Sequence, residues 1–298
     1  MIALPSPQQL RYLIALAETQ HFGRAADTCA VTQSTLSAGI IALERQLDTA
    51  ILDRAAGKRV AFTPLGRDLL GRARVAMAAL QAVAETAEAA RAPMSGRLRL
   101  GVIPTLGPFL LPRLMPALRA AFPRLEPWLR EDQTERLLEQ LGAGRLDLLV
   151  LALPCDCAGN ETLAVARDEF LVALPAGHPL AAEERIPARA LHAERLLLLE
   201  DGHCLRDQVL SLCGARPTTE EFAATSLHTL VQMVAGGLGV TLLPRIAVDA
   251  GISAGTGIVL RPLAGRGGWR TLGLTWRPHA ARATDFRRLA PLLADAAG

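Results

Sequence analysis

The sequence predicts three successive parts: a helical N-terminal unit with a helix-turn-helix layout, a long linker helix, and a C-terminal α/β unit of two lobes. Three patterns predict this division. Apolar residues recur at helical spacing up to about residue 90, the stretch RAPMSG then breaks the pattern, and from Arg97 onward strand patterns alternate with helical ones. At 298 residues the chain is also long for a single hydrophobic core.

Composition narrows the classes of protein before any motif is considered. Half of the residues are apolar, a fifth are charged, and the net charge is +3, so the chain is expected to fold. Residues 1 to 90 hold nine Arg or Lys against eight Asp or Glu, and bulk charge therefore gives no argument for nucleic-acid binding. The longest apolar runs are too short to span a bilayer and the first residues lack the features of a signal peptide. We expect a cytoplasmic protein with no membrane contact, whose thiols are kept reduced.

The first part carries the spacing of a helix-turn-helix. RYLIALAETQ and FGRAADTCA read as helices, and a further helix begins at Thr32 or Gln33 with Leu36, Ile40 and Leu43 on one face. Ala25 and Ala26 allow two helices to cross closely, and Val31 can fill the turn. The side chains expected to face outward at the front of the last helix, where such motifs read the major groove, are Gln33, Ser34, Thr35 and Ser37.

A short hairpin and a long helix follow. Residues 59 to 63 alternate as a strand does, which predicts a wing with Lys58 and Arg59 at its tip, suited to phosphate contact. Thr63 can cap a helix that begins at Pro64 and runs to about Ala90. Its length and its apolar stripe favour a coiled-coil-like dimerisation helix. The expected domains are 1–63 (DNA binding), 64–95 (linker and dimerisation helix with a hinge) and 96–298.

The remaining part reads as β-α-β-α-β followed by a second series of strands and a C-terminal helix over about 281–296. The second series comprises DEFLVALP, which begins at Asp168, then RLLLLE, GVTLLP and RTLGLTW. Two lobes joined by two crossing strands fit this order, with lobe I at about 96–163 and 270–298 and lobe II at about 164–269. Ligands of open α/β sheets bind at the carboxyl ends of strands and between lobes. Thr105 and Cys204 both follow such strand ends.

The segment GHCLRDQVLSLC holds two of the five cysteines on one predicted helix. In a reducing compartment such a pair is redox-active, metal-binding or inert. Cys204 is expected at the helix N-terminus with Arg206 nearby, and both features favour a reactive thiolate.

These residues resemble a known family. FGRAADTCAVTQSTLSAGIIALERQL followed by ILDRAAGKRVAFTPLG resembles the winged helix-turn-helix of LysR-type transcription regulators. IPTLGPFLLP, the DQT of Asp132 to Thr134 and GHCLRDQVLSLC are similar to the peroxide-sensing branch of that family. The resemblance covers essentially the whole chain and implies a periplasmic-binding-protein-like regulatory domain. Departures are Gly39 to Ala42, where many relatives carry a basic or amide residue, and Arg130, where a histidine is expected.

The resemblance implies a role for each residue of the site. Cys204 is the sensing cysteine and Cys213 the resolving one, so that a sulfenic acid on Cys204 condenses into a Cys204–Cys213 disulfide. Thr105 and Thr134 would hold the peroxide oxygens, His203 would flank the site, and Arg270 would stabilise the thiolate. It implies no cofactor, no metal and no enzymatic activity.

The spacing of the pair has a physical consequence. Nine residues of continuous helix separate two Cα atoms by about 13 to 14 Å and place the side chains on opposite faces. A disulfide needs Cα atoms within roughly 7 Å, so the helix must come apart before the bond can close. We expect the repacking to change the spacing of paired DNA-binding domains. The implied partners are promoter double-stranded DNA, hydrogen peroxide, RNA polymerase and further copies of the chain in a dimer of dimers, and the implied targets are antioxidant genes.

Four alternatives remain open at the level of the sequence. Cys213 can be an inert core thiol. Cys155 and Cys157, with His203 and Cys204, can be a metal site, although C-x-C alone is a weak signal. A thiol peroxidase would share the activated cysteine, but it would need no DNA-binding front end. A LysR-type regulator that responds to a small molecule in the cleft between the lobes would survive mutation of Cys204.

Overall fold

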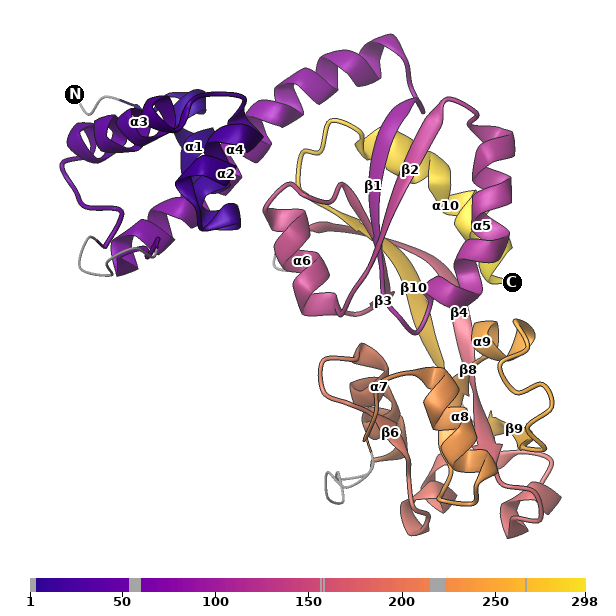
Figure 1. Cartoon of the computed structure of the whole chain (residues 1–298). Helices are drawn as coiled ribbons and strands as arrows, with labels where there is room; N and C mark the ends of the chain where they lie inside the picture. The colour runs from indigo at the N-terminus through magenta and orange to yellow at the C-terminus, as the bar shows by residue number, and fades with distance from the viewer. Residues whose placement is uncertain (1–3, 54–59, 156, 158, 215–222, 266) are drawn as a thin grey trace. The chain divides into compact units, whose positions relative to one another are not determined.

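The computed structural model describes residues 4–53, 60–155, 157, 159–214, 223–265 and 267–298 (Figure 1). It divides into two compact units. The first ends at Glu88 and also takes in residues 142–144, and the second comprises Ala89–Leu141 and Arg145–Gly298. The expected boundaries at residues 63 and 95 stay a prediction.

The first unit consists of three short helices and most of a long one. Side-chain caps at their N-termini determine the residue at which several of these helices begin. The helices are α1 (Pro7–Thr19), α2 (Phe22–Cys29), α3 (Gln33–Gln46) and α4 (Pro64–Arg91). Ser6 and Gln9 form a capping box at α1, and the Thr32 hydroxyl accepts a hydrogen bond from the backbone of Thr35 at the front of α3. Ala25 and Ala26 are buried, as the predicted close crossing of two helices requires.

The hairpin arms pair where the sequence predicts a wing. Leu52 and Phe62 form an antiparallel bridge, and the Thr63 N–H donates to the Ile51 carbonyl at 3.0 Å. Lys58 and Arg59, the predicted tip, lie outside the described residues. The Thr63 hydroxyl accepts from Gly66 N at 2.9 Å and so caps α4. Exposed apolar side chains on α4 are Leu65, Val75, Leu80 and Val83.

The second unit is built on one sheet with the strand order β2-β1-β3-β10-β4-β9-β5, in which β8 also pairs with β4. The strands of the first lobe are β1 (Gly96–Val102), β2 (Leu125–Glu131), β3 (Leu148–Leu153) and β10 (Trp269–Trp276). Strand β1 pairs in parallel with β2 and with β3, and β10 runs antiparallel to β3. The helices of this lobe are α5 (Gly107–Ala121), α6 (Thr134–Gly142) and α10 (Ala283–Ala297).

Strand β4 (Glu161–Leu174) joins the lobes. Its first half pairs with β10 from Glu161 to Glu169, and its second half pairs with β8 and β9 of the other lobe. The other elements of the second lobe are β5 (Ile186–Pro187), β6 (Leu198–Leu199), β7 (Ala223–Ala224), β8 (Thr241–Pro244), β9 (Val259–Ala264), α7 (Cys204–Cys213), α8 (Leu227–Ala235), α9 (Arg245–Asp249) and the short 3-10 helices η2 (Pro179–Ala182) and η3 (Ala188–Ala193). The two-lobe fold with crossing strands is as predicted.

Two predicted strands differ in length from the observed ones. We expected a strand to begin near Asp168, but β4 begins at Glu161 because its first half pairs with β10 although its side chains are mostly half-exposed. RLLLLE gives only the two-residue strand β6, which pairs with β7 in a separate small sheet. Both lengths depend on which partner strand is available, and a single sequence does not show that.

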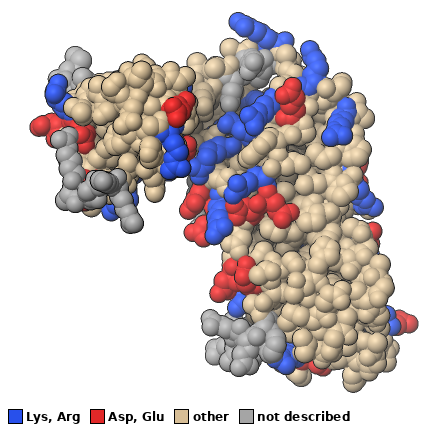
Figure 2. All heavy atoms as spheres, viewed as in Figure 1, with Lys and Arg blue, Asp and Glu red and all other residues tan. Residues whose placement is uncertain are grey.

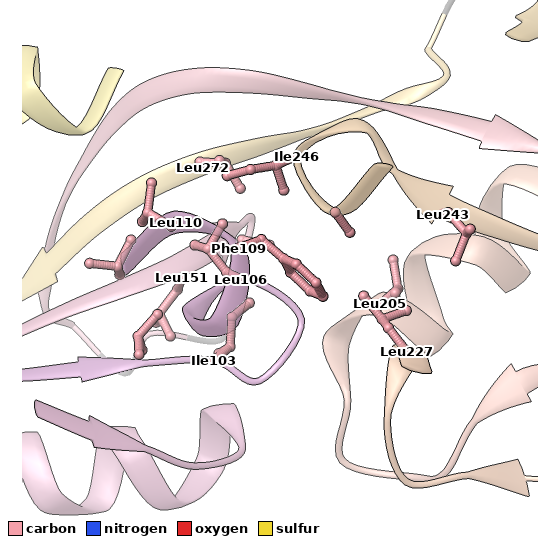
Figure 3. Packing of buried hydrophobic residues seen from close by; sticks show 14 of the residues in the cluster. Ile103, Leu106, Phe109, Leu110, Leu151, Leu205, Leu227, Leu243, Ile246 and Leu272 are labelled. Carbon is pink, nitrogen blue, oxygen red and sulfur yellow. The ribbon is translucent and has the colours of Figure 1, made fainter. Parts of the chain in front are cut away.

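One hydrophobic core runs through both lobes of the second unit. Phe109 and Leu110 of α5 and Leu106, the residue before that helix, lie in it together with Leu205 of α7. Figure 3 shows the Phe109 ring directed from α5 toward Leu205 and Leu227, and this ring also stacks on the ring of His228 with centroids 5.8 Å apart. The core therefore ties α7 to the first lobe. Among the described residues no helix is long and apolar enough to cross a membrane.

Charge is unevenly distributed on the surface. On the face drawn in Figure 2, acidic and basic side chains both occur on the first unit. This agrees with the near balance of charge in residues 1 to 90. In the second unit the charged side chains on this face gather mainly on the lobe that carries α6, and the lobe that carries α7 is largely neutral.

Candidate functional site

Cys204 is the first residue of α7, and a tight loop places it there. His203 is the N-cap with extended backbone, and Gly202 before it has a φ of 91°. A Cβ on Gly202 would lie 2.7 Å from the side-chain oxygen of Gln133. The Gln133 side chain in turn donates a hydrogen bond to the carbonyl of Asp201 at 3.3 Å. Only glycine combines this φ with this close approach, so the loop holds Cys204 next to the start of α6.

A cavity of about 720 Å³ opens beside Cys204. Both lobes contribute to its walls, through α6, the end of β3, β4, α7 and β10. Its lining residues are Thr134, Glu135, Leu138, Leu153, Pro154, Cys155, Phe170, Gly202, Cys204, Asp207, Gln208, Ser211, Leu212, Trp269 and Arg270. Sequence reasoning placed three of these, Cys204, Thr134 and Arg270, in one site, and the fold brings them together here.

Opposing effects act on the Cys204 thiol. Burial raises its pKa above the ordinary value, whereas the charge of Arg270 and a hydrogen bond from the Thr134 hydroxyl act to lower it, and the charge of Asp207 acts to raise it. The net direction is upward. Desolvation is the largest of these effects, and in this conformation it outweighs the lowering by Arg270 and Thr134.

Arg270 is fully buried and links three segments. Its Nε donates to Asp168 Oδ2 at 2.9 Å, its Nη1 donates to the Thr105 hydroxyl at 2.9 Å, and its Nη2 donates to the Thr105 carbonyl at 3.0 Å. Asp168 Oδ1 also accepts from the backbone of Ile246 at 3.0 Å. The Asp168 carboxylate therefore balances the charge of Arg270, and only part of that charge acts on Cys204.

The structure places Thr105 and His203 behind the cavity wall. Thr105 is 2% exposed and contacts the site through Arg270. His203 is 6% exposed, with Nε2 3.8 Å from Glu200 Oε1. Burial lowers the pKa of His203, and Glu200 acts in the opposite direction, so the neutral imidazole is favoured at neutral pH. Neither side chain is among the described residues that line the cavity.

Cys213 stands at the other end of the same unbroken helix. It is 1% exposed, and burial raises the pKa of its thiol to about 11. With Leu205 and Val209 it forms the buried face of α7, since the three residues follow one another at intervals of four. Cys204, Asp207, Gln208 and Ser211 face the cavity instead. Both cysteines are free thiols, on different faces and about 13 to 14 Å apart along the helix axis.

Arg206 does not act as the sequence suggested, and Arg130, which stands where a histidine is expected, lies toward solvent. Arg206, expected near the Cys204 thiol, forms an ion pair with Asp201 at 2.8 Å and donates to the Leu199 carbonyl at 3.1 Å. It therefore fixes the loop before α7. Arg130 is half-exposed and pairs with Asp132 at 3.0 Å, away from the described lining of the cavity.

Sequence reasoning missed the placement of Cys155. It lines the same cavity as Cys204, and it forms a disulfide with Cys157. The C-x-C spacing was the available signal, but we read it as a weak metal motif. Among the described residues no group of three or more His, Cys, Asp or Glu side chains is placed to hold a metal ion.

The front of α3 presents the polar side chains expected there. Gln33, Ser34 and Thr35 are exposed, and Ser37 is half-exposed. The Thr32 hydroxyl lies 2.9 Å from that of Ser34 and 2.8 Å from that of Thr35, so the cap orders these two hydroxyls. The opposite face of α3, which includes Leu36, is buried in the unit.

Comparison with known proteins places both units. Residues 7–67 match the family described as "Bacterial regulatory helix-turn-helix protein, lysR family", and residues 91–298 match "LysR substrate binding domain". The "DNA-binding transcriptional dual regulator OxyR" of Escherichia coli strain K12 is 42% identical over 285 residues, which cover 95% of this chain and 93% of that protein.

Two further comparisons agree. The "Probable hydrogen peroxide-inducible genes activator" of Streptomyces viridosporus is 41% identical over 295 residues, which cover 98% of this chain and 94% of that protein. Among solved structures, full-length OxyR from Pseudomonas aeruginosa matches with a TM-score of 0.81 and 36% identity, covering 98% of this chain and 95% of that one.

Proposed function

The chain belongs to the LysR family of bacterial helix-turn-helix regulators, and on that basis we propose that it senses hydrogen peroxide and controls transcription. One observation carries the proposal. A cavity-facing Cys204, in contact with a hydroxyl donor and near a buried cation, begins a helix that ends in a second free cysteine. The relatives named for hydrogen peroxide support the same reading.

The chemistry begins at the Cys204 sulfur. Its thiolate attacks one peroxide oxygen, the O–O bond breaks, and the leaving hydroxide takes a proton to become water. In this proposal Thr134 holds a peroxide oxygen and Arg270 stabilises the thiolate. Thr105 and His203 flank the site from behind the cavity wall, and Thr105 acts through its hydrogen bonds with Arg270. The product is a sulfenic acid on Cys204. No metal or cofactor is required for these steps.

The second step requires α7 to unwind. The Cys213 thiol condenses with the sulfenic acid, water leaves, and a disulfide forms. A disulfide holds Cα atoms within roughly 7 Å, but continuous helix keeps these two about 13 to 14 Å apart. Leu205 and Val209, which are buried beside Cys213, must therefore leave their places in the core. Oxidation therefore converts α7 from its helical, core-packed state into a second, bridged state with different packing.

The change of fold would act on DNA through the assembly. In the proposed complex, two or more copies present the front of α3 to promoter DNA through Gln33, Ser34, Thr35 and Ser37, with Lys58 and Arg59 at the backbone. The exposed apolar side chains of α4, such as Val75 and Val83, offer a surface for pairing. Repacking around α7 would alter the spacing between DNA-binding units in a dimer of dimers. The oxidised protein would then recruit RNA polymerase to antioxidant genes in the cytoplasm.

The direct test combines chemistry and DNA binding. Reduced protein is treated with a molar excess of hydrogen peroxide, the Cys204 to Cys213 segment is examined by mass spectrometry, and the promoter footprint is recorded before and after. The proposal expects a Cys204–Cys213 disulfide and a changed footprint. Cys29→Ser, in the first unit, serves as a control that keeps both changes.

Cys204→Ser separates the proposal from its nearest alternative. We expect this variant to form no such disulfide and to keep the reduced footprint under peroxide. A footprint that changed equally in Cys204→Ser would contradict peroxide sensing at this residue. It would place the response to peroxide at another residue. The alternative, a regulator that binds a small molecule in the cavity, predicts that Cys204→Ser keeps its response to that molecule.

A further inference from the structure

A second pair of cysteines lies beside the sensing one. Cys155 follows β3 in the first lobe, is half-buried, and lines the cavity that Cys204 lines from the second lobe. Cys157 lies deeper, 9% exposed, with its sulfur 4.0 Å from the Thr275 hydroxyl. The Cα atoms of the pair are 5.2 Å apart, and the two sulfurs are bonded. This chain therefore holds a redox-competent pair in the wall of the site.

Cys155 and Cys213 are the two possible disulfide partners of an oxidised Cys204, and they differ in whether they can reach it while α7 is helical. The residues of α7 that face the cavity are Cys204, Asp207, Gln208, Ser211 and Leu212. Cys213 belongs to the buried face and reaches Cys204 only if α7 unwinds. Cys155 shares the open space with Cys204 while α7 is still helical. Burial also raises the pKa of the Cys213 thiol to about 11, which keeps it protonated and unreactive until it is uncovered.

We propose that Cys155 and Cys157 form a second resolving pair, which takes the oxidation from Cys204 without unwinding α7. This inference rests on the proposed function, because it needs the sulfenic acid on Cys204. The Cys155 thiol condenses with that sulfenic acid, releasing water and forming a Cys204–Cys155 disulfide. The Cys157 thiolate then attacks the Cys155 sulfur, and Cys204 leaves as a thiolate that takes up a proton.

The relay has a defined set of products. For each peroxide consumed, two molecules of water and one Cys155–Cys157 disulfide are formed, and Cys204 returns to the thiol. The Cα atoms of Cys155 and Cys157, 5.2 Å apart, are close enough for that disulfide. The relay competes with Cys213, so the reduced pair would absorb the first oxidant before α7 changes its fold. The Cys155–Cys157 pair would thus set how much peroxide is needed before α7 unwinds.

Trapping the intermediate tests the relay in the full-length chain. The protein is reduced, the reductant is removed without air, stoichiometric hydrogen peroxide is added, and free thiols are blocked before disulfides are identified by mass spectrometry. Wild type is expected to yield the Cys155–Cys157 disulfide first. Cys157→Ser should stop the relay at a Cys204–Cys155 disulfide, and Cys155→Ser should lose both products and yield more Cys204–Cys213. Cys29→Ser is the matched control and should behave as wild type.

The outcomes separate this inference from the proposed function. A Cys157→Ser protein that forms Cys204–Cys213 but no Cys204–Cys155 link would overturn the relay and leave the sensor intact. Cys204 that stays unoxidised in every variant would overturn both. In Cys213→Ser, continued formation of the Cys155–Cys157 disulfide would show that the relay runs without the resolving cysteine of α7, and its loss would contradict the relay.

Discussion

At the scale of single residues, the reactivity of Cys204 depends on a balance that burial dominates. Desolvation disfavours the thiolate, and the Thr134 hydroxyl and the Arg270 charge favour it. Because the pKa is raised, the thiolate fraction at neutral pH is smaller than for an ordinary thiol. The rate of oxidation by peroxide should therefore keep increasing with pH beyond the range in which a free cysteine reaches its plateau.

Removing the hydroxyl donor should shift this balance further. Thr134→Val keeps the size of the side chain but gives the thiolate no hydrogen bond. A hydrogen bond to a charged group is worth about 1.5 to 3 kcal/mol, so we expect Cys204 oxidation to be at least about tenfold slower at neutral pH. The rate profile should move to higher pH. Timed alkylation of the remaining Cys204 thiol measures the rate, and Thr134→Ser, which keeps the donor, should restore it.

The Arg270–Asp168 ion pair makes a different prediction, on stability. Both side chains are almost fully buried, at 0% and 1% exposure. Asp168→Asn leaves a buried charge without its partner, which should lower the free energy of unfolding by about 3 to 5 kcal/mol in urea denaturation. The neighbouring pair of Glu169 with Arg245 is exposed. Glu169→Gln should therefore change stability by less than about 1 kcal/mol, and an equal loss in both variants would refute the role of burial.

The sequence identified several residues of the site but not how they are connected. Cys204, Thr134 and Arg270 could be named from motifs, and they meet in one cavity. The pairing of Arg270 with Asp168 could not be foreseen, since it depends on β4 and β10 lying side by side in a particular register. Arg206 was misplaced for a related reason. Arg206 is close to Cys204 in the sequence, but its long side chain turns toward Asp201 and forms an ion pair there instead of approaching the thiol.

At the scale of elements, α7 carries the function because its two faces serve different purposes. One face is anchored in the core by Leu205 and Val209, and the other borders the cavity. Its ten residues were predictable from the sequence, as were the starts of α3 and α4, because caps and apolar spacing are local signals. The lengths of β4 and β6 were not, because strand pairing is not local.

The cost of unwinding α7 should control the rate of the switch. Gln208 lies in the middle of the helix and faces the cavity. Gln208→Gly should weaken the helix by about 1 kcal/mol relative to Gln208→Ala, and so speed conversion of the sulfenic acid to the Cys204–Cys213 disulfide by roughly fivefold. Quenched-flow samples analysed by mass spectrometry give this rate. Equal rates in the two variants would indicate that helix unwinding does not limit the step.

At the scale of the whole molecule, the redox site and the DNA-binding unit belong to separate compact parts of one chain. In the proposed function, coupling between them passes through the assembly of several copies. The charge of residues 1 to 90 is nearly balanced, so the proposed contact with DNA would depend on the polar side chains at the front of α3 more than on net charge. The second unit has one continuous core across its lobes, and a local change in α7 must be accommodated by that core.

Hydrogen exchange over the entire chain tests the central claim most directly. Protein whose Cys204–Cys213 disulfide has been verified by mass spectrometry is compared with the fully reduced protein. We predict that the backbone amides of residues 205–212 lose their helical protection on bridging, while the strands of the main sheet keep theirs. Equal protection of residues 205–212 in the two forms would contradict the account.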